Sequence, residues 1–247
     1  MVRIYQKKEI EILREGGRKL AEVVENIAQE IKKNRTGEEI DKLAHRLMNK
    51  AGGTPSFLNH DGFPASLCLS INDEVVHSVP DARRFRKGDI VGLDAGLNYQ
   101  GFHTDMAKTI IVGRVEDKVK NFVETAKNAL ESGIKAARPG EAVGDIGFTI
   151  QKLVEKRGFS VVQELSGHGV GKELHEEPAI PNFGKKGEGE KLIPGMVIAI
   201  EPIINMGGRE IETSIDGWCV KTKDKSLSAH FEHTVLITNS EPEILTC

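Results

Sequence analysis

Two carboxylates flank a polar turn near the middle of the chain. Asp94 follows an apolar run that is typical of a buried strand, and Asp105 precedes a second β-rich run. The segment 98–101, Asn-Tyr-Gln-Gly, is typical of a tight hairpin turn. With Tyr99 and Gln100 as the loop residues, Asp94 and Asp105 would lie directly opposite each other. Like charges in such a pair are destabilising, so the hairpin indicates either a bound cation or two solvated aspartates beside a turn.

An internal repeat adds two further carboxylates. The segments 87–94 and 194–201 share the pattern of a short apolar strand that ends in an acidic residue, Asp94 in one and Glu201 in the other. The segments 102–110 and 229–237 likewise place Asp105 in correspondence with Glu232. We therefore predict two pseudo-symmetric α/β halves whose four carboxylates meet at the centre.

The elements that position these residues follow from apolar periodicity. Steps of three and four predict helices over residues 7–33, 37–51, 117–137 and 143–157. Thr36 and Glu39 form a capping box at the start of the second helix. The segment 54–80 is loop-rich and contains a short strand over 67–71. The chain is thus an α/β (α+β) protein, and we expect residues 1–247 to form one catalytic domain.

Composition narrows the class of protein. A net charge of −3 with 29% charged residues gives no hint of nucleic-acid or membrane binding. Cys68, Cys219 and Cys247 are too few and too scattered for a disulfide framework, which favours a reducing compartment. There is no apolar run of membrane-spanning length and no signal-peptide pattern at the N-terminus. We expect a cytoplasmic protein.

His168 lies among glycines in the segment 164–178, between the two halves. On its own it would be a loop histidine. With four carboxylates that need a counter-charge, it becomes a candidate fifth ligand in an oxygen-rich set that suits Mn(II), Fe(II) or Co(II), with Zn(II) as an alternative. Two divalent ions bridged by carboxylates balance the four negative charges and activate water for hydrolysis.

Taken together, the motifs resemble those of a type I methionine aminopeptidase. They are the two aspartates eleven apart, SGHGVG at 166–171, HEEP at 175–178, AIEP at 199–202 and FEHT at 231–234. The resemblance implies the pita-bread fold, in which helices cover a curved, mostly antiparallel sheet, and it implies two metal ions. The implied ligands are Asp94, Asp105, His168, Glu201 and Glu232, with Asp105 and Glu232 bridging both ions.

The resemblance also implies the reaction. A hydroxide activated by the two metals would remove the N-terminal methionine from a new polypeptide with a small second residue. Glu201 would transfer the proton, His175 would bind the oxyanion and His77 would contact the scissile amide, although each histidine could instead be a satisfied loop residue. The partners would be the N-termini of nascent polypeptides, with ribosome association left open, and the protein would be a monomer.

By position, six residues match the lining of the methionine pocket, where His77 and His175 also contact the substrate: Phe57, His60, Phe63, Cys68, Leu174 and Trp218. His60 stands where such enzymes commonly have Tyr, and Leu174 where many have Phe. Prolidase and aminopeptidase P share the ligand set but usually carry an added N-terminal domain, and type II enzymes carry an insertion before the Glu201 strand. A binding protein that has lost catalysis is a further alternative, although such proteins tend to lose ligands.

Overall fold

The computed structural model describes residues 2–247. Its helices are α1 (Lys7–Glu30), α2 (Gly37–Lys50), α3 (Asp117–Ala136) and α4 (Val143–Lys156). The first helix ends three residues earlier than predicted, because Ile31 turns to an extended backbone and becomes buried. The capping box of α2 is confirmed: the Glu39 amide donates to Thr36 Oγ1 (3.2 Å), and the Thr36 amide donates to the Glu39 carboxylate (3.1 Å). None of the helices in residues 2–247 is both long and apolar enough to cross a membrane.

The main sheet runs through both halves of the chain. Its strand order is β1 (Thr54–Pro55), β4 (Ile90–Tyr99), β5 (Phe102–Ile111), β14 (Glu232–Leu236), β9 (Val197–Ile200), β7 (Ser166–Gly169) and β8 (Glu176–Pro181), with β2 (Cys68–Ile71) on β4 and β15 (Glu243–Ile244) on β14. Two smaller sheets have the orders β13 (Ser228–His230), β10 (Ile203–Asn205), β6 (Ser160–Val161), and β11 (Ile211–Thr213), β12 (Val220–Thr222), β3 (Glu74–Val76). Every strand pairing among the described residues is antiparallel.

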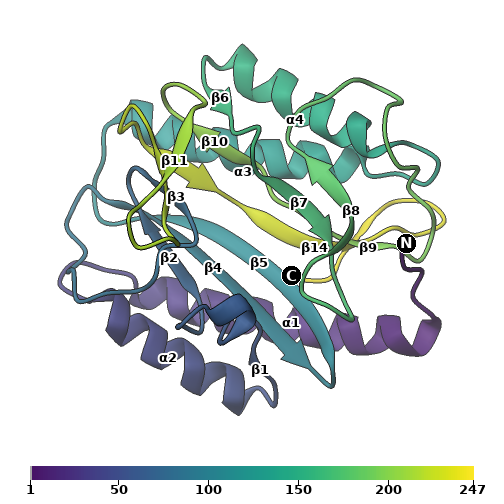
Figure 1. The fold of residues 1–247 in the computed structure, drawn as a ribbon, viewed down its shortest axis with the longest axis horizontal. Coiled ribbons are helices and arrows are strands. Elements are labelled where there is room, and N and C mark those ends of the chain that lie inside the picture. The colour runs from purple at the N-terminus through teal and green to yellow at the C-terminus, as the bar shows by residue number, and fades with distance from the viewer. Residues whose placement is uncertain (1) are drawn as a thin grey trace.

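The two halves meet where β5 pairs with β14, and β4 and β9 flank this central pair. Helices α1 and α2 lie beside the first half, and α3 and α4 lie beside the second (Figure 1). Side chains from α1, α2, β2 and β4 form one core, and side chains from α3, α4, β9 and β14 form another. This arrangement confirms the predicted α/β fold with helices covering an antiparallel sheet.

Alternation along β4 places the site on the face away from the helices. Leu93 and Ala95 are fully buried in the core formed with α1 and α2. Since successive side chains of a strand point to opposite faces, Asp94 points to the other face.

The predicted hairpin register is wrong by two residues. Tyr99 pairs with Phe102, so the loop residues are Gln100 and Gly101, with φ of 51° and 80°. A two-residue hairpin of this kind needs positive φ at both loop positions, and Gly101 adopts it without the strain that Tyr99 would incur. Asp94 therefore pairs with Ala107 and Asp105 with Gly96. The two aspartates are diagonal neighbours on one face instead of a direct pair.

Candidate active site

A cavity of about 310 Å³ lies over the centre of the sheet, and every predicted site residue lines it. These residues are Phe57, His60, Phe63, Cys68, His77, Asp94, Asp105, His168, Leu174, His175, Glu201, Trp218 and Glu232. Five lining residues were not predicted: Asp61, Val76, Leu165, Ser166 and Ile203. Asp61 follows His60 in a short 3-10 turn, and each of the others lies within three residues of a predicted site residue. Nearness in the sequence to a predicted residue is therefore the one signal that could have located them.

The carboxylates come from the central strands. Asp105 lies on β5 and Glu232 on β14, Asp94 lies on β4, and Glu201 follows the last residue of β9. Ligand atoms of Asp105, His168 and Glu232 all lie within 4.8 Å of one another. Glu232 therefore stands at the junction of the two halves.

His168 presents one ring nitrogen to this cluster. Its Nδ1 donates to the carbonyl of Gly169 at 2.9 Å, which leaves Nε2 as the nitrogen with a free lone pair. Nε2 lies 3.9 Å from Glu201 Oε1 and 4.0 Å from Glu232 Oε1. These separations are too long for hydrogen bonds, but they suit ligands that share a cation at about 2.0–2.2 Å from each.

His230 is a member of the site that the sequence analysis missed. Its Nε2 lies 2.9 Å from Glu201 Oε2, although the N–H direction is not that of a hydrogen bond. His230, Glu201 and Glu232 form a second group of ligand atoms within 4.8 Å of one another. The internal repeat aligned His230 with His103, but His103 bonds Ser56 and Asn98 instead, so the repeat carried no usable signal.

Burial sets the protonation of the cluster. Burial raises the pKa values of Asp94 and Glu232 well above their usual ranges, and the neighbouring carboxylates raise them further. Burial raises the pKa of Asp105 to about 6, against the opposing effect of His168. For Glu201 burial is the largest single effect and acts upward, but the imidazoles of His230, His168 and His77 together outweigh it and lower the pKa.

The donor set fits divalent metal ions. Among residues 2–247, Asp94 Oδ1 and Glu232 Oε1 are buried without a hydrogen-bond partner. Buried acceptors of this kind are destabilising unless something satisfies them. Four carboxylates and an imidazole that converge on one cavity supply oxygen and nitrogen ligands for such ions.

The two histidines of predicted catalytic role face the same cavity. Burial lowers the pKa of His175 to about 4, with a further contribution from His168, and its ring centroid lies 4.5 Å from that of His168. Burial also lowers the pKa of His77. The backbone of His77 has φ of 59°, an uncommon conformation for a non-glycine residue and one that clusters at functional sites. Both rings are therefore neutral donors near pH 7.

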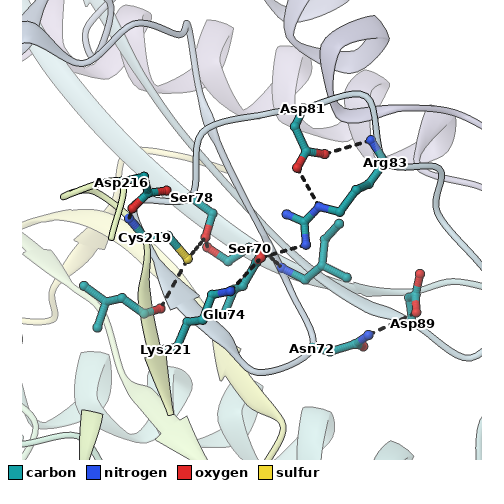
Figure 2. A network of polar contacts seen from close by, with 12 residues as sticks. Ser70, Asn72, Glu74, Ser78, Asp81, Arg83, Asp89, Asp216, Cys219 and Lys221 are labelled. Atoms are coloured by element: carbon teal, nitrogen blue, oxygen red, sulfur yellow. Dashed lines mark hydrogen bonds and ion pairs between the residues drawn. The ribbon is translucent and has the colours of Figure 1, made fainter. Parts of the chain in front are cut away.

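A polar network joins the segment that follows His77 to the segment that carries Trp218 and Cys219 (Figure 2). The hydroxyl of Ser78 contacts the thiol of Cys219 at 2.9 Å, and Asp216 Oδ1 accepts from the amides of Trp218 and Cys219 at 3.0 and 3.1 Å. Because Ser78 follows His77 and Cys219 follows Trp218, the contact ties these two lining residues together.

Glu74 is a buried member of the same network. Its carboxylate is buried, lies 2.8 Å from Arg83, and accepts from the amide of Ile71 at 2.8 Å (Figure 2). The carbonyl of Ser78 accepts from the amide of Leu69 on β2. The His77 turn is thus fixed between β2 and the segment that carries Cys219.

An apolar slot opens beside the carboxylates. Phe57, Phe63, Cys68 and Leu174 are buried against one another, and Trp218 packs edge-on against Phe63 with ring centroids 5.3 Å apart. Burial raises the pKa of the Cys68 thiol well above its usual range, so this wall of the slot is uncharged. His60 is about one-third exposed at the rim.

The fold and this site define a metallopeptidase, and the comparisons agree. The model of metallopeptidase family M24 matches residues 11–239, and the chain belongs to that family. Bacterial methionine aminopeptidases are among its full-length relatives. The chain is 42% identical over 246 residues to the methionine aminopeptidase of Clostridium perfringens (100% of this chain, 99% of the relative) and 43% identical over 239 residues to methionine aminopeptidase 1 of Bacillus subtilis (97% and 96%).

Solved structures give the same grouping. The crystal structure of methionine aminopeptidase from Rickettsia prowazekii matches with a TM-score of 0.98 and 38% identity over 100% of both chains. Prolidase from Pyrococcus furiosus matches with a TM-score of 0.81 and 26% identity, but only 65% of that chain is covered. The resemblance to methionine aminopeptidases and the pita-bread fold are confirmed.

Proposed function

We propose that this chain removes the N-terminal methionine from polypeptides with a small second residue, using two divalent ions held by Asp94, Asp105, His168, Glu201 and Glu232. One observation carries the proposal. Cys68, in the apolar slot, pairs directly with Asp94 across β2 and β4. The slot therefore begins one strand away from the ligands, where a bound methionine side chain would leave its amine and scissile carbonyl beside the carboxylates.

When bound, the two ions supply a Lewis acid for the scissile carbonyl and an activated water. Glu201 is suited to take a proton from the attacking water and deliver it to the leaving amine, since the neighbouring imidazoles together lower the pKa of its carboxylate. His175, neutral near pH 7, can donate a hydrogen bond to the developing oxyanion. His77 lines the same cavity and would contact the scissile amide.

The apolar slot sets the choice of side chain. Phe63 and Trp218 form two of its walls, and the uncharged thiol of Cys68 forms another. An unbranched thioether fits such a slot, because sulfur packs favourably against aromatic rings.

Substrates that carry a new N-terminus imply a cytoplasmic site of action. We propose a single-domain monomer that acts on emerging polypeptides, with or without ribosome contact.

The test compares peptides and metals. Metal-free protein is reconstituted with Mn(II), Fe(II), Co(II) or Zn(II), and release of the first residue is measured from Met-Ala-Ser and from Xaa-Pro peptides. We expect Met-Ala-Ser to be cut with at least one metal and Xaa-Pro peptides to be cut poorly. Preference for Xaa-Pro bonds would instead indicate a prolidase, the name of the matched Pyrococcus furiosus structure.

Metal stoichiometry separates an enzyme from a binding protein of the same fold. We expect two ions per chain by elemental analysis after gel filtration. Glu164→Gln removes an exposed carboxylate near the His168 strand that is outside the proposed ligand set, so this variant should keep both ions. A parent protein that binds no divalent ion would contradict the proposal.

A further inference from the structure

The phenol of Tyr5 lies against the loop that carries Leu174 and His175. Its oxygen accepts a hydrogen bond from the amide of Lys172 at 2.7 Å, and it donates to the carboxylate of Glu176, whose two oxygens are 2.8 and 2.9 Å away. Burial raises the pKa of this phenol, so it remains protonated and able to donate. Since Lys172 and Glu176 bracket Leu174 and His175, one hydroxyl holds both ends of the loop.

The loop has little freedom to move away from this contact. The carboxylate of Glu176 also accepts from the amide of Glu173 at 2.9 Å, which closes the loop on itself. The carbonyl of Gly171 accepts from the amide of His103 at 2.6 Å. Gly171 packs so closely on Tyr5 that a Cβ at this position would collide with the phenol oxygen.

Tyr5 is itself fixed to the frame that carries the metal ligands. Its side chain is only 3% exposed and packs in a core cluster with residues of α1, β9 and β14. Its ring lies edge-on to that of Phe102, at the start of the strand that contains Asp105, with centroids 6.1 Å apart. Its amide donates to the carbonyl of Gly195 at 2.8 Å, and the neighbouring Val2 and Ile4 line a surface pocket with Glu177 and Pro178 of β8.

The His175 ring depends on its loop for orientation. Among residues 2–247 no side chain hydrogen-bonds this ring, and its neighbours are the rings of His60 and His168, at centroid distances of 5.3 and 4.5 Å. A displacement of the backbone between Lys172 and Glu176 would therefore move the ring directly.

We propose that Tyr5 is a positioning residue for the reaction. Through Glu176 and Lys172 it fixes His175 over the ligand cluster. This inference rests on the role proposed above for His175.

The first experiment replaces Tyr5 by Phe, which keeps the buried ring and removes the hydroxyl. We expect kcat on Met-Ala-Ser to fall about 10-fold with metal content unchanged and KM changed by less than about twofold, because a small misplacement of a catalytic group acts on the chemical step. The matched control is Tyr99→Phe, which removes the same kind of bond, from Tyr99 to the exposed Glu15 (2.9 Å), away from the loop. The control should retain the parental kcat when both are measured well below their unfolding temperatures.

The second experiment asks whether Tyr5 acts through His175. In a double-mutant cycle, Tyr5→Phe should lower kcat little further in a His175→Ala background. If the two substitutions lowered kcat by factors that multiply in the double mutant, the inference would be overturned. A Tyr5→Phe variant as active as Tyr99→Phe would also overturn it. In either case a low kcat in His175→Ala would leave the proposed function standing. Parental activity in His175→Ala would instead remove the role proposed for His175, and with it this inference.

Glu176 variants provide a test that does not alter the core. Glu176→Gln keeps an oxygen acceptor for the phenol and for the Glu173 amide, whereas Glu176→Ala removes both. We expect kcat to fall more in Glu176→Ala than in Glu176→Gln. Equal activity of the two variants and the parent would overturn the inference independently of how well Tyr5→Phe folds.

Discussion

The hydroxyl of Thr234 and the main chain of Asp105 form a reciprocal pair of hydrogen bonds across the centre of the sheet. The Asp105 amide donates to Thr234 Oγ1 at 2.8 Å, and the same hydroxyl donates to the Asp105 carbonyl at 2.8 Å. Thr109 does the same for His230, at 2.9 and 2.8 Å. Glu232 lies between these two pairs, opposite Ala107. Two threonine hydroxyls thus set how the carboxylates of the two halves approach each other.

Replacing Thr234 by Val should loosen the site while preserving side-chain shape. The change leaves the buried amide and carbonyl of Asp105 without these partners, which costs about 1–3 kcal/mol of stability. Metal affinity should fall about 10–100-fold, since loss of a group that orients a ligand typically has that effect. Thermal unfolding and metal titration measure the two effects.

Two variants control this experiment. Thr234→Ser retains the hydroxyl and should stay close to the parent. Thr238→Val removes a hydroxyl that donates to the Glu241 carbonyl in the exposed turn between β14 and β15, and it should leave metal binding unchanged. Parental metal affinity in Thr234→Val would show that the reciprocal pair does not orient Asp105.

Glu232→Gln should abolish activity and leave at most one weakly held ion. Glu232 belongs to both groups of ligand atoms, the one with Asp105 and His168 and the one with Glu201 and His230. The resemblance makes Glu232 a bridge between the two ions, so neutralising it should weaken both sites. The metal-free variant should unfold at a higher temperature than the metal-free parent, because the raised pKa of Glu232 costs the parent stability near pH 7, and a glutamine has no carboxyl to keep charged or to protonate on folding. Metal content near two ions per chain would refute the assignment of Glu232 as a bridge.

Ser78→Ala tests whether the contact with Cys219 positions His77 and Trp218. We expect kcat/KM to fall about 3–10-fold through misorientation of the two lining residues. Cys219→Ser keeps a hydrogen-bonding group and should be closer to the parent than Cys219→Ala. Ser240→Ala, at an exposed position, is the control for loss of a serine hydroxyl. Activity of Ser78→Ala equal to that of Ser240→Ala would exclude the positioning role.

Local patterns predicted the helices and most of the residues that meet in the cavity. Apolar spacing located all four helices, and the Thr36 capping box located the start of one of them. The hairpin register could not be obtained in the same way, because Asn-Tyr-Gln-Gly contains two candidate loop pairs. Which pair forms depends on which residues accept positive φ, and here Gln100 and Gly101 do.

The contacts that could not be predicted from the sequence join segments that lie far apart in the chain. His230 reaches Glu201 only because β13 pairs with β10, directly beside the end of β9. Tyr5 and Glu176 are 171 residues apart in the sequence, and no local pattern relates them. Both contacts depend on how the sheet curves and packs, so spacing along the chain carries no signal for them.

The apolar slot should give a strong but incomplete preference for methionine. Phe63, Trp218 and Cys68 provide walls for an unbranched side chain, and Leu174 is buried on the same slot. A hydrophobic pocket discriminates by only about 1–3 kcal/mol per methylene. We therefore expect norleucine to be accepted and leucine to be cut slowly but measurably.

Because Leu174 is smaller than Phe, Leu174→Phe should lower kcat/KM for leucine and other bulky analogues more than for methionine. Metal content should stay the same, since Leu174 is not a ligand. The measurement is kcat/KM for Met-, norleucine-, Leu- and Pro-initiated peptides with the parent and the variant. A leucine peptide cut as fast as the methionine peptide by the parent would refute the assignment of this slot to methionine, whatever the state of the metal site.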